Sequence, residues 1–124
     1  MKEIRYTRQP NGYWCGQACV AMLAGVPVEE VVAVMNNDKG TGKKDLENAL
    51  NHYGICQAKT MTKADNTSVL PRACILKVLL PKYGHWILYC DGKYYDPEFG
   101  LMEELYPKAR IQSYLEIFLD DEES

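Results

Sequence analysis

Long apolar stretches are missing from this chain. No run approaches the roughly 18 consecutive apolar residues that a membrane-spanning helix needs, and residues 1–10 lack the apolar centre of a secretory signal peptide. The sequence therefore predicts no membrane span and no export signal, and we expect a cytoplasmic protein.

The chain also lacks an excess of either charge. Its 14 Lys and Arg residues and 17 Asp and Glu residues give a net charge of −3, and the pI is near 5.4. Such a balance provides no general attraction to nucleic acid or to anionic membranes. We therefore expect neither as a partner.

Cysteine is present, but not in the pattern of a disulfide framework or a metal site. The five cysteines are an odd number, and they show neither metal-ligand spacing nor pairing with histidine: Cys15, Cys19, Cys56, Cys74 and Cys90. This pattern suits free thiols in a reducing compartment. Three of them sit in apolar runs and are expected in the core. The sequence predicts no metal and no cofactor.

Repeats and linker-like stretches are absent as well. At 124 residues and 47% hydrophobic composition, the chain has room for one core of ordinary size. We expect a single domain over residues 1–124, with the acidic residues 120–124 forming a solvated, frayed end.

The most informative stretch that is present runs from residue 9 to residue 25. Residues 10–12 (Pro-Asn-Gly) favour a turn, and the apolar residues 18–24 indicate a helix that ends at Gly25. Cys15 then lies at the helix N-terminus, where unpaired backbone amides and the helix dipole favour a thiolate. Cys15 is thus a candidate nucleophile, whereas Cys19, one turn later, is expected to face the core.

A second stretch predicts a base for this thiol. Asp91–Gly92 lies between two aromatic and aliphatic runs, which is a strong signal for a two-residue hairpin turn, with Cys90 opposite Lys93. Counting outward places His85 and Asp96 on one face as diagonal neighbours, about 7 to 8 Å apart at the backbone. Side chains of this length can close that gap with a hydrogen bond. A thiol, an imidazole and a carboxylate in this arrangement are typical of acyl-transfer enzymes.

These segments together resemble the papain-like cysteine peptidases of the C39 group, including its stand-alone C39-like branch. The resemblance rests on Gln9, Cys15-Gly16-Gln17-Ala18, Gly84-His85-Trp86 and Asp96-Pro97-Glu98-Phe99-Gly100, which span most of the chain in the family's order. It implies an α+β papain-like fold, in which N-terminal helices carrying the catalytic cysteine at a helix N-terminus pack on an antiparallel sheet that holds the histidine and the aspartate.

The resemblance also implies a role for each residue. Cys15 would be the nucleophile, His85 the general base and acid, Asp96 the group that orients His85, and Gln9 a side-chain donor to the oxyanion. The Cys15 amide and the Gln9 carboxamide, brought back by the turn, would together hold the developing charge. The implied function is thiol-dependent hydrolysis of a peptide or protein substrate through a thioester.

Two alternatives stay open. The same groups would also serve an amidase or acyltransferase that acts on a non-peptide amide. Alternatively, the fold is a binding or inhibitory module that has lost the chemistry. The second alternative draws on Trp14, which stands where bacteriocin-processing members of the family usually carry Asp, and on the small size of the chain.

The remaining pattern predicts the other elements. His52, the second histidine, lies on a predicted helix without an Asp partner in a strand, so we interpret it as a surface residue. We expect helices after Pro27 and over residues 43–53, strands over 3–9, 55–60, 73–80 and on both sides of Asp91–Gly92, a polar connection over 63–68, a helical turn over 102–106 and a helix over 112–119.

Overall fold

The computed structural model describes residues 3–119, so the expected acidic end at 120–124 lies outside the described residues. The described chain forms helices first and strands afterwards. The helices are α1 (Cys15–Ala24), α2 (Val28–Met35) and α3 (Lys43–His52). The strands are β1 (Cys56–Gln57), β2 (Thr62–Lys63), β3 (Ala73–Leu79), β4 (Gly84–Cys90), β5 (Lys93–Asp96), β6 (Gly100–Met102) and β7 (Arg110–Phe118).

The three helices lie where their start and stop signals predict them. Helix α1 ends at Gly25, whose φ of 72° is left-handed and whose N–H bonds the Ala21 carbonyl at 2.8 Å. Helix α2 follows Pro27 and ends at Asn36, which also has a left-handed backbone. Among residues 3–119 no single helix has the length and apolar character to cross a membrane; α1 and α2, bent by 112° at their junction, meet that test only when taken together.

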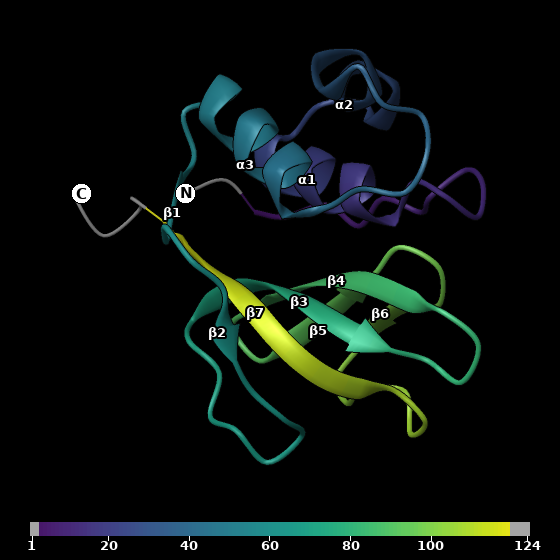
Figure 1. Ribbon diagram of the computed structural model, residues 1–124, viewed down its shortest axis with the longest axis vertical. Coiled ribbons are helices and arrows are strands. Elements are labelled where there is room, and N and C mark those ends of the chain that lie inside the picture. Colours follow the sequence, from purple (N-terminus) through teal and green to yellow (C-terminus); the bar gives the residue numbers. More distant parts are fainter. Residues whose placement is uncertain (1–2, 120–124) are drawn as a thin grey trace.

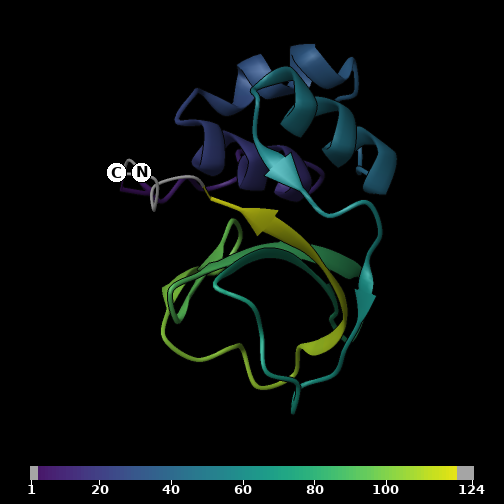
Figure 2. The same ribbon diagram turned by 90° about the vertical axis from the view of Figure 1, so that its left-hand side faces the viewer.

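The strands form an antiparallel sheet in the order β1-β7-β3-β4-β5-β6, and β2 also pairs with β7. The predicted meander over residues 73–96 is confirmed as β3, β4 and β5. Both views show the helices gathered over one side of the sheet, and Figure 2 shows how strongly the sheet curves. This is the α+β arrangement that the sequence predicts.

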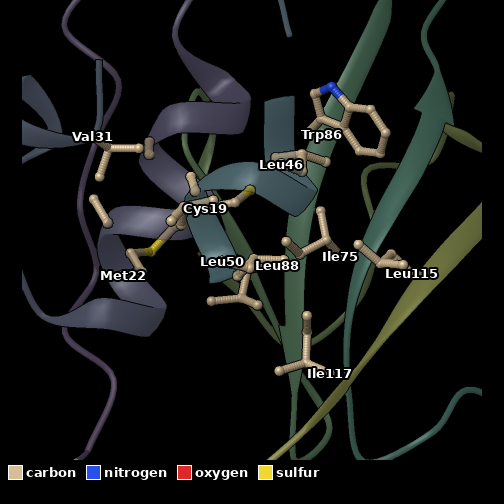
Figure 3. Close-up of a cluster of buried hydrophobic side chains, with 14 of the residues drawn as sticks. Cys19, Met22, Val31, Leu46, Leu50, Ile75, Trp86, Leu88, Leu115 and Ile117 are labelled. Carbon is tan, nitrogen blue, oxygen red and sulfur yellow. The ribbon is translucent and has the colours of Figure 1, made fainter. Parts of the chain in front are cut away.

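The main core lies between the helices and the sheet. Figure 3 shows Cys19 and Met22 of α1 and Leu46 and Leu50 of α3 facing Leu88 of β4. Fully burying a side chain of leucine size contributes about 1.5 to 3 kcal/mol, so this contact holds the two layers together. A second cluster combines alternate residues of β3 with residues of β4, β7 and the adjoining loops: Cys74, Leu76, Val78, Leu80, Ile87, Ala109 and Ile111.

The prediction of a strand over residues 3–9 is wrong. This segment has no strand partner, and single contacts attach it instead to the turn between β5 and β6. The Tyr6 hydroxyl donates to the Asp96 carbonyl at 2.6 Å, and the Gln9 N–H donates to the Pro97 carbonyl at 2.9 Å. The alternation of apolar and polar residues in this segment reflects an extended backbone that is attached to the β5–β6 turn but does not pair with any described strand.

The C-terminal region differs most from expectation. Residues 112–119 were expected to be helical, but residues 112–118 lie in strand β7. The helical turn expected over 102–106 is replaced by the end of β6 and an irregular loop. Strand β7 buries Ile111, Leu115 and Ile117 against the sheet beside β3, which overrides local helix preference. The strand expected over 55–60 is only Cys56–Gln57, and the polar connection after it begins with a short strand, Thr62–Lys63.

Candidate active site

Cys15 is the first residue of α1, directly after a tight turn. The Asn11 side-chain oxygen accepts the Tyr13 N–H at 2.8 Å, and the Trp14 carbonyl accepts the first helical bond, from the Ala18 N–H, at 2.9 Å. No described side chain caps this helix start, which leaves the Cys15 amide available to an anionic group. Cys15 is partly exposed, whereas Cys19 is fully buried, as expected.

The predicted hairpin brings His85 and Asp96 together. Cys90 pairs with Lys93 as expected, and Asp91 and Gly92 have positive φ angles of 49° and 84°, as a two-residue turn requires. His85 Nε2 lies 2.7 Å from Asp96 Oδ1, and each side chain is only 1% exposed. The hydrogen bond inferred from strand register is therefore present.

Further donors fix the Asp96 carboxylate. Its Oδ1 atom also accepts the Glu98 N–H at 2.8 Å and the Phe99 N–H at 3.1 Å, so Asp96 closes its own turn. The Oδ2 atom is buried and has no hydrogen-bond partner among the described residues. Because the carboxylate only accepts in these contacts, His85 Nε2 donates to it, and Nδ1 is left for the thiol.

The pKa of His85 reflects competing effects. Burial alone lowers it, but hydrogen bonds with the Asp96 and Cys15 side chains, together with their charges, raise the pKa of His85 from 6.5 to about 9. At neutral pH the imidazole therefore carries a proton. This is the charge state that a neighbouring thiolate stabilises and that a departing amine needs.

Gln9 lies beside the same turn. It is buried, its backbone N–H donates to Pro97, and its side-chain Nε2 donates to the Asn11 carbonyl at 2.7 Å. A carboxamide carries two N–H groups, so one donor remains after this bond. The Pro10–Gly12 turn thus holds the Gln9 amide in a fixed position ahead of Cys15.

Sequence reasoning missed the loop that packs over the start of α1. Side-chain N–H groups next to the proposed catalytic residues bind the carbonyls of residues 37–41: Trp14 to Asp38, Gln17 to Asn37 and Lys39, and Trp86 to Thr41, at 2.9 to 3.0 Å. The Trp86 indole lies against Gly16, and its N–H donates to the Thr41 carbonyl. The rings on the imidazole are those of Tyr83 and Phe99. Glycine at position 16 was the signal that could have indicated this close approach.

This packing predicts the effect of Gly16→Ala. A methyl group there would lie 1.9 Å from Thr41 Oγ1 and 3.3 Å from Trp86 Cδ1, so the loop must move. We expect the free energy of unfolding to fall by about 1 to 3 kcal/mol, as for other overpacked sites. Urea denaturation measures it. Gly40→Ala is the control, since a methyl group there meets nothing within 4 Å; equal losses in the two variants would contradict the contact.

Other candidates for chemistry lie elsewhere. His52 ends α3, is exposed and makes an edge contact with the Tyr53 ring at 4.9 Å. Within residues 3–119 no three His, Cys, Asp or Glu side chains gather as a metal-binding group.

No protein-family model matches the sequence, and a search of curated proteins also finds no match. Among solved structures the chain is similar to the peptidase domain of Streptococcus ComA, a bifunctional ABC transporter involved in a quorum-sensing pathway. The two share 17% sequence identity with a TM-score of 0.63, over 92% of this chain and 98% of that domain. At this identity the likeness concerns the fold, and it supports the C39-like architecture indicated by the motifs.

Proposed function

We propose that this chain is a C39-like cysteine peptidase that cleaves peptides through a thioester intermediate. Cys15 is the nucleophile, His85 the general base and acid, Asp96 the orienting group and Gln9 an oxyanion donor. The observation that carries the proposal is the buried His85–Asp96 pair, 2.7 Å apart, together with the interaction of His85 with the Cys15 thiol at the start of α1, which raises the pKa of His85.

In this mechanism the Cys15 sulfur attacks the scissile carbonyl carbon while the Cys15 and Gln9 amides hold the oxygen. His85 gives its proton to the departing nitrogen, and the C–N bond breaks to leave the thioester. A water molecule then attacks the thioester, loses a proton to His85, and releases the acid and the Cys15 thiolate. The Asp96 carboxylate keeps Nδ1 of His85 directed at the sulfur throughout.

A peptide library tests the proposal. Pooled synthetic peptides are incubated with the wild type and with Cys15→Ala, and new termini are identified by mass spectrometry. We expect cleavage by the wild type alone. If Cys15 is alkylated readily but no peptide is cut, the amidase or acyltransferase alternative is favoured; an unreactive Cys15 favours the binding module.

Iodoacetamide should modify Cys15 before the other thiols, because it combines a helix start with an imidazole partner. Burial raises the pKa of Cys74 to about 12 and raises the pKa of Cys19 well above its usual value, and Cys90 is also buried. The useful comparison is with Cys56, because this thiol is also accessible to iodoacetamide but lies in a short strand and not at a helix start. Peptide mapping after limited labelling measures the order, and His85→Gln should slow Cys15 while leaving Cys56 as the internal control. Faster labelling of Cys56 in the wild type would count against the site.

The pH dependence of cleavage should show a limb near pH 9. His85 must be protonated to protonate the leaving amine, so kcat/KM is expected to fall as pH rises through the His85 pKa of about 9. Asp96→Asn removes the carboxylate charge that raises this pKa but keeps an oxygen acceptor. The limb should therefore move to lower pH, with a smaller loss of turnover than in Cys15→Ala. An unmoved limb in Asp96→Asn would show that another group sets it.

A further inference from the structure

Exposed aromatic rings extend outward from the imidazole of His85. Tyr83 and Phe99 each contact the imidazole edge to face, with ring centroids 6.2 Å away, and Tyr106 stacks on Phe99 at 5.2 Å. Tyr83 and Phe99 are each 43% exposed, and Tyr106 is 37% exposed. We call these three residues the aromatic shelf. Such large apolar rings on a surface indicate a binding role when they adjoin a site.

The shelf is fixed relative to the proposed catalytic pair. The Tyr83 hydroxyl donates to Glu98 Oε1 at 2.6 Å, and the amides of Glu98 and Phe99 bind the Asp96 carboxylate. Figure 1 shows the β3–β4 turn and the β5–β6 turn at the same end of the sheet as the loop that precedes α1. These hydrogen bonds therefore fix the positions of the Tyr83 and Phe99 rings relative to His85, so this surface is preformed.

We propose, resting on the function proposed above, that the aromatic shelf binds the residue that follows the scissile bond and selects an apolar, preferably aromatic, side chain there. His85 protonates the departing nitrogen, so that nitrogen lies against the imidazole during cleavage. The side chain next to the nitrogen then lies over the rings that border the imidazole. Aromatic pairs in offset or edge geometry contribute about 0.5 to 1.5 kcal/mol beyond burial of area, which favours an aromatic residue.

Aminolysis of the thioester, which is the reverse of the cleavage step, tests the binding of the leaving-amine half of the substrate separately from the acyl half. When an amine attacks the thioester, its nitrogen forms a bond to the acyl carbon, one N–H proton passes to neutral His85, and the carbon–sulfur bond breaks. The products are a new amide and the Cys15 thiolate beside protonated His85. The attacking amine occupies the same place as the leaving amine in hydrolysis, so its preference reports on the shelf.

The experiment uses the p-nitrophenyl ester of N-benzyloxycarbonylglycine, an activated ester that acylates a reactive thiol without peptide recognition. The acyl-enzyme is then partitioned between water and phenylalaninamide or glycinamide, and the amide and acid products are quantified by chromatography. For the wild type we expect phenylalaninamide to trap at least about tenfold more efficiently than glycinamide, which corresponds to about 1.4 kcal/mol.

Phe99→Leu and Tyr106→Ala remove one ring each, the first with its apolar volume largely kept so that the turn still folds. Both should bring the phenylalaninamide preference towards unity. Phe118→Ala is the matched control, because Phe118 is an exposed aromatic residue on β7, and it should keep the wild-type preference. A wild type without preference, or a preference unchanged in both shelf variants, would overturn the inference while the function stands. An absence of any Cys15-dependent p-nitrophenol release overturns both.

Discussion

Replacing His85 by alanine is expected to lower kcat/KM for a cleaved library peptide by about 10³ to 10⁴-fold, since one residue serves as both general base and general acid. His85 is buried and hydrogen-bonded to Asp96, and it interacts with the Cys15 thiol, so alanine removes the proton acceptor and leaves the carboxylate without its imidazole. Alkylation of Cys15 should slow as well, because the imidazolium that stabilises the thiolate is gone. Steady-state kinetics and iodoacetamide labelling measure the two effects.

Loss of fold is the competing explanation for His85→Ala, because the residue is only 3% exposed. His85→Gln keeps polar atoms within reach of Asp96 and should show a similar loss of activity in a protein with the wild-type circular dichroism spectrum. His52→Ala is the control, as His52 is exposed at the end of α3. A fully active His85→Gln together with an inactive His52→Ala would show that the wrong histidine has been assigned.

Replacing Gln9 by alanine is expected to lower kcat by about 10² to 10³-fold, the usual cost of removing one oxyanion donor. Alkylation of Cys15 should stay nearly unchanged, because reaction with iodoacetamide forms no tetrahedral oxyanion. The backbone bond from Gln9 to Pro97 survives the substitution. Only the carboxamide, with its bond to Asn11 and its remaining N–H, is lost.

The matched control is Gln57→Ala, because the Gln57 side-chain N–H donates to Asn51 in the last turn of α3 at 2.8 Å and makes no described hydrogen bond to a proposed catalytic residue. It should keep wild-type turnover. If Gln9→Ala loses alkylation and turnover in parallel, Gln9 holds the loop in place and does not act on the oxyanion. If Gln9→Ala turns over like the wild type, the oxyanion is stabilised by other donors.

The parts of the site that sequence predicted are those whose geometry depends on short segments. The Asp91–Gly92 turn fixes the register of β4 and β5, and register places His85 on the face of Asp96. Helix α1 begins and ends at local signals, which sets the position of Cys15. In both cases a few neighbouring residues decide the outcome.

The sequence-based predictions of structure are wrong where contacts with distant parts of the chain determine the conformation. Strand β7 resembles a helix in isolation and is a strand because β3 lies beside it. The loop over residues 37–41 has no motif of its own and is positioned by the side chains of Trp14, Gln17 and Trp86. Likewise, the extended segment before Gln9 is anchored to a turn some ninety residues later in the chain. Local patterns contain no information about these contacts.

The position of β7 between β1 and β3 has a consequence for the newborn protein. Among the described elements, α1 with Cys15 is synthesised before the β4–β5 hairpin with His85 and Asp96, and β7, which covers one edge of β3, is synthesised after both. Until that strand arrives, β3 presents unpaired backbone groups on one side, and the sheet that supports His85 is incomplete. Under the proposed function, Cys15 would therefore gain its full set of partners only after β7 has been synthesised and has paired with β3.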